Sequence, residues 1–161
     1  YRLDMDDIPG MVVAIAHNGQ IIYEEAFGYA DMESQTEMTV GHRFHVASQS
    51  KSITAAAMMK LVEVGKIRLD DTVSRHLPWL KKHNDKRWHA VTLRQLLSHR
   101  AGVLRDGLDA DYWQLDGVFP SRESLKEIIL SSELVIDANV KMKYSNIGYG
   151  LLGLVIEEVT G

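Results

Sequence analysis

Residues 44–65 read FHVASQSKSITAAAMMKLVEVG, and this stretch decides how the rest of the chain is interpreted. Behind Ser48, apolar residues recur at helical spacing: Ile53, Ala57, Leu61 and Val64. Gly65 is a good C-terminal stop, so the spacing predicts a helix over residues 48–65. Ser48 stands at the start of this helix, where free N–H groups and the helix dipole stabilise negative charge.

The residues before this helix predict a β-hairpin. Two apolar runs, 11–17 and 20–27, are separated by Asn18-Gly19. This pair accepts positive φ at both central positions of a type I′ turn, the turn that fits two-residue hairpins. We expect residues 28–43 to form an irregular connection to the helix.

Further helices are expected downstream of residue 65. They are residues 93–98 with Thr92 as N-cap, residues 121–130 with Ser121 as N-cap, and residues 146–160 before Gly161. A cap serine or threonine followed by apolar periodicity is the usual start of a helix. A hairpin followed by helices indicates an α+β fold, and we expect residues 1–161 to belong to a single domain.

The composition excludes several classes of function. The chain has 161 residues, no cysteine and a net charge of −4, so thiolate chemistry and a broad nucleic-acid surface are not expected. The one basic run, residues 81–87, is interrupted by Asp85 and is interpreted as a solvated loop. No apolar run reaches the roughly 18 residues of a membrane span. The start of the chain lacks the pattern of a signal peptide, and the compartment stays open between cytoplasm and exterior.

Ser48 and Lys51 are candidate catalytic residues because of their spacing. A serine hydroxyl needs a nearby base to become a good nucleophile, and an i, i+3 pair lies on one face of a helix. Lys51 would then accept the proton of Ser48. The pair alone also fits a helix-capping serine followed by a solvated lysine, so both readings stay open on this evidence.

A second candidate motif is Tyr144-Ser145-Asn146, at a predicted junction between a loop and a helix. Tyr144 could shuttle a proton, while Asn146 could bind a substrate carbonyl and accept a hydrogen bond from Lys51. The ordinary alternatives are a half-buried tyrosine and a helix N-cap. The pair His42 and His45 lacks a third ligand at a recognisable spacing, so we expect no metal site.

Taken together, these segments resemble the β-lactamase-related serine hydrolases, a family of class C β-lactamases, D-Ala-D-Ala carboxypeptidases, D-aminopeptidases and esterases. The resemblance rests on residues 44–52 and 61–71, on Leu96-Leu97-Ser98-His99-Arg100-Ala101-Gly102, on Tyr144-Ser145-Asn146, and on Ile8-Pro9-Gly10 with the hairpin. These segments occur in the family's order across essentially the whole chain. The resemblance implies a β-lactamase/penicillin-binding-protein-like fold with no cofactor.

The resemblance also implies roles for individual residues. Ser48 forms an acyl-enzyme, Lys51 and Tyr144 share the work of a base, and Asn146 binds substrate. The Ser48 N–H would supply half of an oxyanion hole. The implied ligand is a small molecule or peptide with an amide or ester carbonyl, with peptidase or esterase activity favoured slightly over β-lactamase activity.

One family feature has no match. The third motif, a Lys or His followed by a small residue and Gly, lies on a later strand in the family, whereas His17-Asn18-Gly19 precedes Ser48. We therefore expect this chain to be the N-terminal portion of a domain, with an open sheet edge that a C-terminal fragment or a second chain completes. The alternative functions are a penicillin-recognising sensor that is acylated without turnover, and a non-catalytic binding module on the same scaffold.

Overall fold

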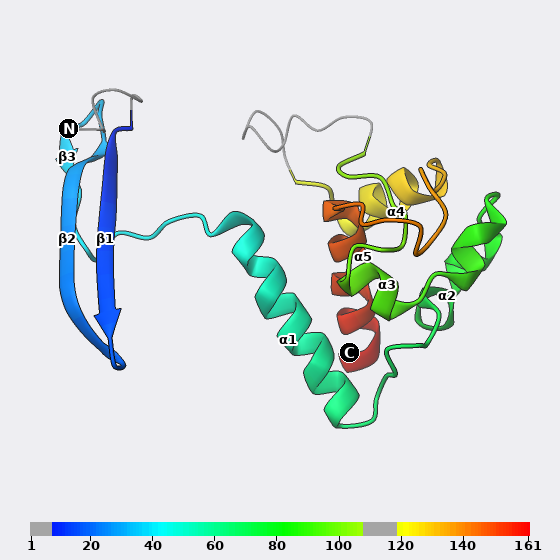
Figure 1. The fold of residues 1–161 in the computed structure, drawn as a ribbon. Helices are drawn as coiled ribbons and strands as arrows, with labels where there is room; N and C mark the ends of the chain where they lie inside the picture. The colour runs from blue at the N-terminus through cyan, green and yellow to red at the C-terminus, as the bar shows by residue number, and fades with distance from the viewer. Residues whose placement is uncertain (1–7, 108–118) are drawn as a thin grey trace. The chain divides into compact units, whose positions relative to one another are not determined.

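A computed structural model describes residues 8–107 and 119–161, which form two compact units divided between Val46 and Ala47. The first unit is a small antiparallel sheet (Figure 1). Strands β1 (Gly10–His17) and β2 (Gln20–Asp31) pair from Gly10 opposite Gly28 to His17 opposite Gln20. The turn between them has φ of 49° at Asn18 and 76° at Gly19. These two positive values confirm the predicted hairpin.

The expected irregular connection over residues 28–43 is partly wrong. Strand β2 continues to Asp31, and a short strand β3 (Thr36–Glu37) pairs with it, so the sheet order is β1-β2-β3. The Asp31 carboxylate causes the reversal by accepting hydrogen bonds from the backbone N–H groups of Glu33 at 2.9 Å and Ser34 at 3.3 Å. Such an aspartate turn mimics a backbone turn and needs no apolar pattern, so the hydrophobic periodicity did not reveal it.

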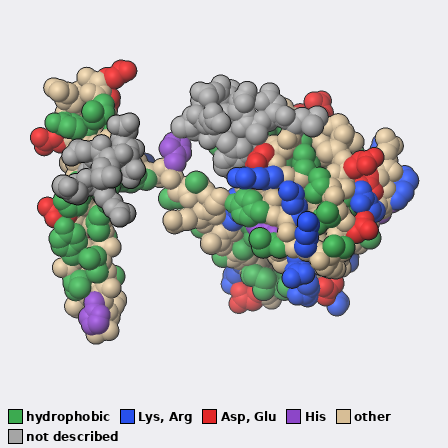
Figure 2. Space-filling model, turned by 45° about the horizontal axis from the view of Figure 1, so that its top comes forward, with side chains coloured by type: hydrophobic (Ala, Val, Ile, Leu, Met, Phe, Trp, Pro, Cys, Tyr) green, Lys and Arg blue, Asp and Glu red, His purple; other side chains and the backbone are tan. Residues whose placement is uncertain are grey.

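The sheet unit carries its apolar side chains on the surface. None of the described residues from 8 to 46 is buried, and Figure 2 shows green side chains spread over this unit. The large exposed apolar residues of the hairpin are Met11, Ile15, Ile21, Ile22, Tyr23 and Phe27. Within the described residues, β1 has only β2 as a neighbour, so its other edge is unpaired. This is the open edge and exposed apolar surface that the sequence led us to expect.

The second unit begins with the predicted helix. A 3₁₀ turn, η1 (Ala47–Gln49), leads into α1 (Ser50–Glu63), so Ser48 lies in the entering turn. The helix ends as predicted, because Gly65 adopts a φ of 72°. The N–H of Gly65 donates to the carbonyl of Val62 at 3.0 Å, and the N–H of Lys66 donates to that of Leu61 at 2.9 Å. This pair of bonds is a Schellman cap.

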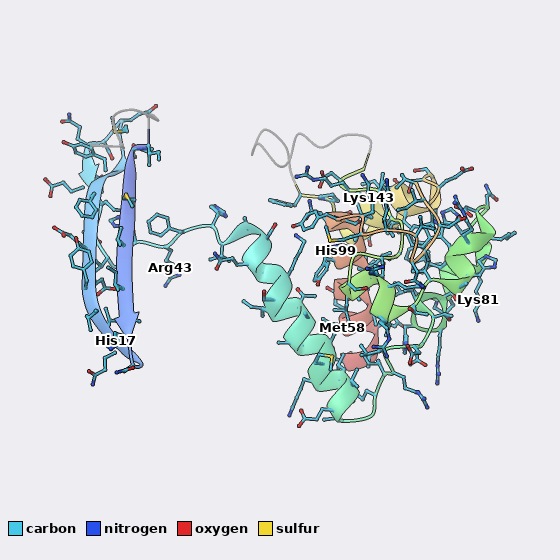
Figure 3. All side chains as sticks on the ribbon, in the orientation of Figure 1. His17, Arg43, Met58, Lys81, His99 and Lys143 are labelled. Carbon is cyan, nitrogen blue, oxygen red and sulfur yellow. The ribbon has the colours of Figure 1, made fainter. Side chains whose placement is uncertain are left out.

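Helix α5 (Asn146–Thr160) is the central element of this unit. It contacts four other helices: α1, α2 (Val73–His76), α3 (Leu93–Leu97) and α4 (Arg122–Leu130). It buries Ile147, Leu151, Leu152 and Val155 in a single apolar core, and Met58 of α1, labelled in Figure 3, joins that core. The predicted N-caps Thr92 and Ser121 are both present.

The glycines of α5 allow close packing of its neighbours. A Cβ added at Gly150 would lie 2.9 Å from a Leu125 methyl group of α4, and one at Gly148 would lie 3.2 Å from Ser145 Oγ. At Gly150, close contact between α4 and α5 therefore compensates for the helix propensity that glycine lacks. At Gly153, by contrast, an added Cβ would meet nothing within 4 Å.

The segment between α1 and α3 was not predicted in detail. It contains α2 and two 3₁₀ helices, η2 (Pro78–Lys82) and η3 (Lys86–Ala90), and short elements of this kind carry no long apolar period. The interpretation of residues 81–87 as a solvated loop is wrong in part, because His83 is buried and its Nε2 lies 2.8 Å from the carbonyl oxygen of Ile129. Within residues 8–107 and 119–161, no helix has both the length and the apolar character needed to cross a bilayer.

Candidate active site

Ser48, Lys51 and Tyr144 lie together in the helical unit, although 96 residues separate the first from the last. Ser48 Oγ lies 2.6 Å from the hydroxyl oxygen of Tyr144, and Lys51 Nζ donates a hydrogen bond to Ser48 Oγ at 3.3 Å. Ser48 is exposed and Lys51 is half-buried. An accessible hydroxyl within hydrogen-bonding distance of a phenol and a lysine nitrogen, each of which is a base when deprotonated, is the arrangement that an activated serine requires.

The ammonium group of Lys51 also lies over two aromatic rings. Its Nζ is 5.0 Å from the ring centroid of Tyr144 and 5.7 Å from that of Tyr149. Both distances are within the range of a cation–π interaction. The lysine head group is therefore directed toward the serine and the tyrosines rather than into open solvent.

The phenol of Tyr144 is electrostatically tuned by its neighbours. Burial acts to raise the pKa of Tyr144, but hydrogen bonds with Lys51 and Ser48 and the positive charges of Lys51 and Arg105 outweigh it, so the pKa of Tyr144 lies below its usual value. The guanidinium carbon of Arg105 lies 6.0 Å from the ring centroid. A lowered pKa makes the phenolate more accessible as a base near neutral pH.

Ser145 fixes the start of α5 directly behind Tyr144. Its buried Oγ accepts a hydrogen bond from the N–H of Gly148 at 2.8 Å and donates one to the carbonyl of Leu104 at 2.6 Å. Ser145 is therefore the N-cap, and Asn146 is the first helical residue rather than the cap.

Asn146 bonds to Asp106, and the hydrogen bond expected between it and Lys51 is not formed. Its Nδ2 donates to the Asp106 carboxylate, while its Oδ1 is buried and has no hydrogen-bond partner among the described residues. A carboxylate only accepts hydrogen bonds, so it orients the amide with the nitrogen toward Asp106. The role of Asn146 in substrate binding stays a prediction.

Three residues around this site, His99, Arg105 and Asp106, were not singled out from the sequence as candidates. His99 packs its ring against Tyr144 and Tyr149, Arg105 faces Tyr144, and Asp106 holds Asn146. His99 was visible in the sequence only as part of the 96–102 segment. Arg105 and Asp106 closely follow that segment, and this position in the sequence is the feature that could have identified them as site residues.

One of the two histidines that were considered as a metal site, His42, serves a local turn. His42 Nδ1 accepts a hydrogen bond from the N–H of Thr39 at 2.9 Å. In the part of the chain that the structure describes, no three His, Asp or Glu side chains gather in a group that could hold a metal ion.

Comparison with known proteins gives one consistent result. The family model described as Beta-lactamase matches residues 2–161. Protein flp of Staphylococcus aureus (strain NCTC 8325 / PS 47) is 30% identical over 163 residues, covering 99% of this chain and 32% of that protein. The chain thus spans about a third of the length of this curated relative.

Solved structures show the same likeness. The class C beta lactamase from Rhodobacter sphaeroides has a TM-score of 0.78 and 28% identity, covering 99% of this chain and 42% of that one. EstCE1, described as a hydrolase with promiscuous acyltransferase activity, has a TM-score of 0.80 and 34% identity, covering 99% of this chain and 44% of that one. These matches confirm the predicted fold class, a β-lactamase-like fold with a small antiparallel sheet and helices.

Proposed function

The chain belongs to the Beta-lactamase family, and on that premise we propose that it acts as a serine hydrolase with Ser48 as its nucleophile. The observation that carries the proposal is the position of Ser48 Oγ, 2.6 Å from the Tyr144 hydroxyl and 3.3 Å from Lys51 Nζ. Both groups can take a proton from the serine, as nucleophilic catalysis requires.

The proposed reaction begins with attack of Ser48 Oγ on an amide or ester carbonyl. As the new C–O bond forms, the serine proton passes to the Tyr144 phenolate or to the Lys51 amine, which share the role of base. The same proton then goes to the departing amine or alcohol, and the bond to that leaving group breaks. Water attacks the resulting acyl-enzyme by the reverse order of proton transfers and releases a carboxylic acid.

Two further groups are proposed to bind the substrate. The backbone N–H of Ser48 supplies one donor of an oxyanion hole, and such a donor is worth about 10²–10³ in kcat. Asn146 is the substrate-binding side chain implied by the family motif. One of its amide hydrogens is used by Asp106, so we expect the other to be donated to a substrate carbonyl.

For the substrate, we propose a D-amino-acid peptide or an ester ahead of a β-lactam. The likeness to EstCE1, a hydrolase with acyltransferase activity, supports an ester, while the likeness to a class C beta lactamase supports a β-lactam as the second candidate. All three present a carbonyl to one serine. A panel of a nitrophenyl ester, a D-Ala-D-Ala peptide and nitrocefin distinguishes them by the rate of each hydrolysis.

Acylation itself is tested with a fluorophosphonate probe. We expect the label on Ser48 when the modified peptide is identified by mass spectrometry. A label on another serine, or on none, would contradict the proposal. If Ser48 is labelled by a fluorescent penicillin, the adduct persists for hours and none of the ester, the D-Ala-D-Ala peptide and nitrocefin is hydrolysed, the protein is a sensor rather than a hydrolase. Loss of the adduct within minutes supports turnover.

We also propose that residues 1–161 form one portion of a larger folded domain, in which a further strand pairs with β1. The edge of β1 that has no strand partner among residues 8–107 and 119–161 supports this proposal, and so do the exposed apolar side chains of the hairpin. An exposed apolar edge strand otherwise invites aggregation. The added strand belongs either to the same polypeptide or to a second chain, and hydrogen exchange of the β1 amides with and without the candidate segment tests it. Amides of β1 that exchange equally fast in both samples would contradict the pairing.

A further inference from the structure

We propose that His99 is a positioning residue for Tyr144, holding the phenol against Ser48 only while its imidazole is neutral. The inference rests on the proposed role of Ser48 as nucleophile. His99 lies just after α3, and Figure 3 labels it beside α5, with Lys143 close by. It has no contact with Ser48 Oγ in the hydrogen bonds and ring contacts described above, and its ring packs against Tyr144, so its expected role is to position that residue.

His99 holds the main chain on both sides of Tyr144. Its carbonyl accepts a hydrogen bond from the N–H of Lys143 at 2.7 Å, and its Nδ1 accepts one from the N–H of Ser145 at 3.2 Å. The Ser145 nitrogen belongs to the peptide group that follows Tyr144. These two bonds therefore restrict the backbone rotation that aims the phenol at Ser48.

The ring of His99 packs against the same tyrosine. Its centroid lies 4.5 Å from that of Tyr144 and 5.0 Å from that of Tyr149, with interplanar angles of 36° and 37°. Tyr149 is itself fixed, because its hydroxyl donates to the carbonyl of Leu97 at 2.9 Å. Tilted rings at this spacing are favourable contacts that restrict rotation of the phenol side chain.

The backbone conformation at His99 is one that glycine usually adopts. The N–H of His99 donates to the carbonyl of Leu96 at 3.1 Å, and the N–H of Arg100 donates to that of Gln95 at 2.7 Å, which forms a Schellman cap on α3. His99 has a φ of 56° at the position of that cap where glycine is the usual residue. A histidine at a position that favours glycine indicates that its side chain has a use.

The protonation state follows from the hydrogen bond. Nδ1 accepts from a backbone N–H, so it carries no proton, and the ring hydrogen is on Nε2. The groups that face the ring are Tyr144 and Tyr149 of the α5 region and Lys51 of α1. The next cation is Arg105, whose guanidinium carbon lies 6.0 Å from the Tyr144 ring centroid. Burial and the charge of Lys51 lower the pKa of His99, which supports the neutral form at neutral pH.

Protonation of His99 would have two local effects. It would remove the acceptor for the Ser145 N–H, and it would add a positive charge near Lys51. The first effect loosens the segment that carries Tyr144, and the second repels the Lys51 ammonium group that lies over the Tyr144 ring. Because the pKa of His99 lies below the ordinary value of about 6.5, we expect this loosening only on the acid side of that value.

The first test is nuclear magnetic resonance of the uniformly ¹⁵N-labelled chain. A two-bond ¹H–¹⁵N spectrum should show His99 with an unprotonated Nδ1 at pH 7, and the Ser145 amide signal should move with the same acid midpoint as the His99 ring. A proton on Nδ1 at pH 7 overturns the inference. So does a Ser145 amide signal whose position does not change as the His99 ring titrates. Neither result depends on whether Ser48 is acylated.

The second test is the rate of fluorophosphonate labelling of Ser48 as a function of pH. His99→Phe keeps a ring but loses the acceptor, and we expect labelling at pH 7 to fall at least tenfold. His99→Asn keeps an acceptor that does not titrate and tolerates positive φ, so we expect it to stay within a few fold and to lose the part of the acid limb that matches the His99 midpoint. His17→Phe, in the sheet unit, is the matched control and should behave as the unaltered chain.

The outcomes separate the two proposals. Labelling of His99→Phe at the unaltered rate, with an unchanged pH profile, overturns the positioning role. An unaltered chain that is never labelled at Ser48 contradicts the proposed function, while the resonance spectrum still decides the tautomer. If His99→Phe does not fold, as judged by circular dichroism, the pH profile of His99→Asn decides: an acid limb identical to that of the unaltered chain overturns the inference.

Discussion

The two units of this chain differ in the number of apolar side chains that they bury. The sheet unit, described from residue 8 to 46, has no buried residue and displays isoleucines and aromatics on its surface. Among its described residues, the helical unit buries 18 apolar side chains around α5. All four candidate site residues belong to the helical unit. The geometry of the site therefore depends on a packed helical core, whereas the sheet unit is stabilised by main-chain hydrogen bonds between its strands.

The sharpest way to test where activity resides is Ser48→Ala. We expect complete loss of fluorophosphonate labelling, because the hydroxyl that contacts both Tyr144 and Lys51 is removed. The side chain is exposed, so the free energy of unfolding should change by at most about 1 kcal/mol. Ser52→Ala, also exposed and one helical turn away, is the control and should be labelled normally. Retained labelling of Ser48→Ala would contradict the assignment.

Lys51→Arg tests whether the lysine acts as a base or only as a positive charge. Arginine keeps the charge and similar reach but does not deprotonate in proteins. We expect the labelling rate to fall by about 10²–10⁴, the usual contribution of a general base. Lys60→Arg on the same helix, where Lys60 pairs with Glu63 at 2.8 Å, should have no effect. A nearly normal rate for Lys51→Arg would leave Tyr144 as the base.

Matched truncations compare the packing of the two units directly. Leu151→Ala in α5 removes a fully buried side chain, and we expect a loss of about 2–5 kcal/mol in the free energy of unfolding. Ile22→Ala in β2 removes a side chain that is 64% exposed, and we expect a change within about 0.5 kcal/mol. Urea titration followed by circular dichroism measures both. A large loss for Ile22→Ala would mean that another surface covers the hairpin in solution.

A fall in pH should reduce the stability of the helical unit more than that of the sheet unit. The pKa of Asp85 is well below its ordinary value, chiefly because of hydrogen bonds from Arg87, together with those from the N–H groups of Leu134 and Arg87. The unfolded chain therefore takes up this proton first, so the stabilisation is present above about pH 4 and is lost as pH falls below it. Asp85→Asn should flatten the fall of stability with acid, whereas Asp31→Asn, on an exposed turn of the sheet unit, should change it less. Equal flattening by both variants would contradict this difference.

The sequence predicted the elements that have strong local signals. The Asn18-Gly19 turn, the Gly65 stop and the Ser121 cap determine their structures from neighbouring residues, and each was located correctly. Ser48 and Lys51 share one helical turn, so their proximity also follows from spacing. The proximity of Tyr144 came from resemblance to a family, because no local rule connects residues 96 positions apart.

The features that were missed depend on contacts between distant segments. Asn146 faces Asp106 because the loop after α3 passes beside the start of α5, where the Arg105 carbonyl accepts from the Asn146 N–H at 2.8 Å. His99 looked like part of a motif, and its bonds to residues 143 and 145 are visible only in three dimensions. Strand β3 and the 3₁₀ helices are too short for hydrophobic periodicity to detect.

The unequal surroundings of the α5 glycines suggest a route to a more robust protein. A Cβ at Gly150 would lie 2.9 Å from a Leu125 methyl group, which would have to move, whereas a Cβ at Gly153 meets no atom within 4 Å. Exchanging a helical glycine for alanine in open space raises stability by up to about 1 kcal/mol, since the unfolded chain loses conformational freedom. Gly153→Ala should therefore raise the melting temperature by a few degrees and leave labelling of Ser48 unchanged. The variant would be a more stable parent protein in which to make substitutions at the site.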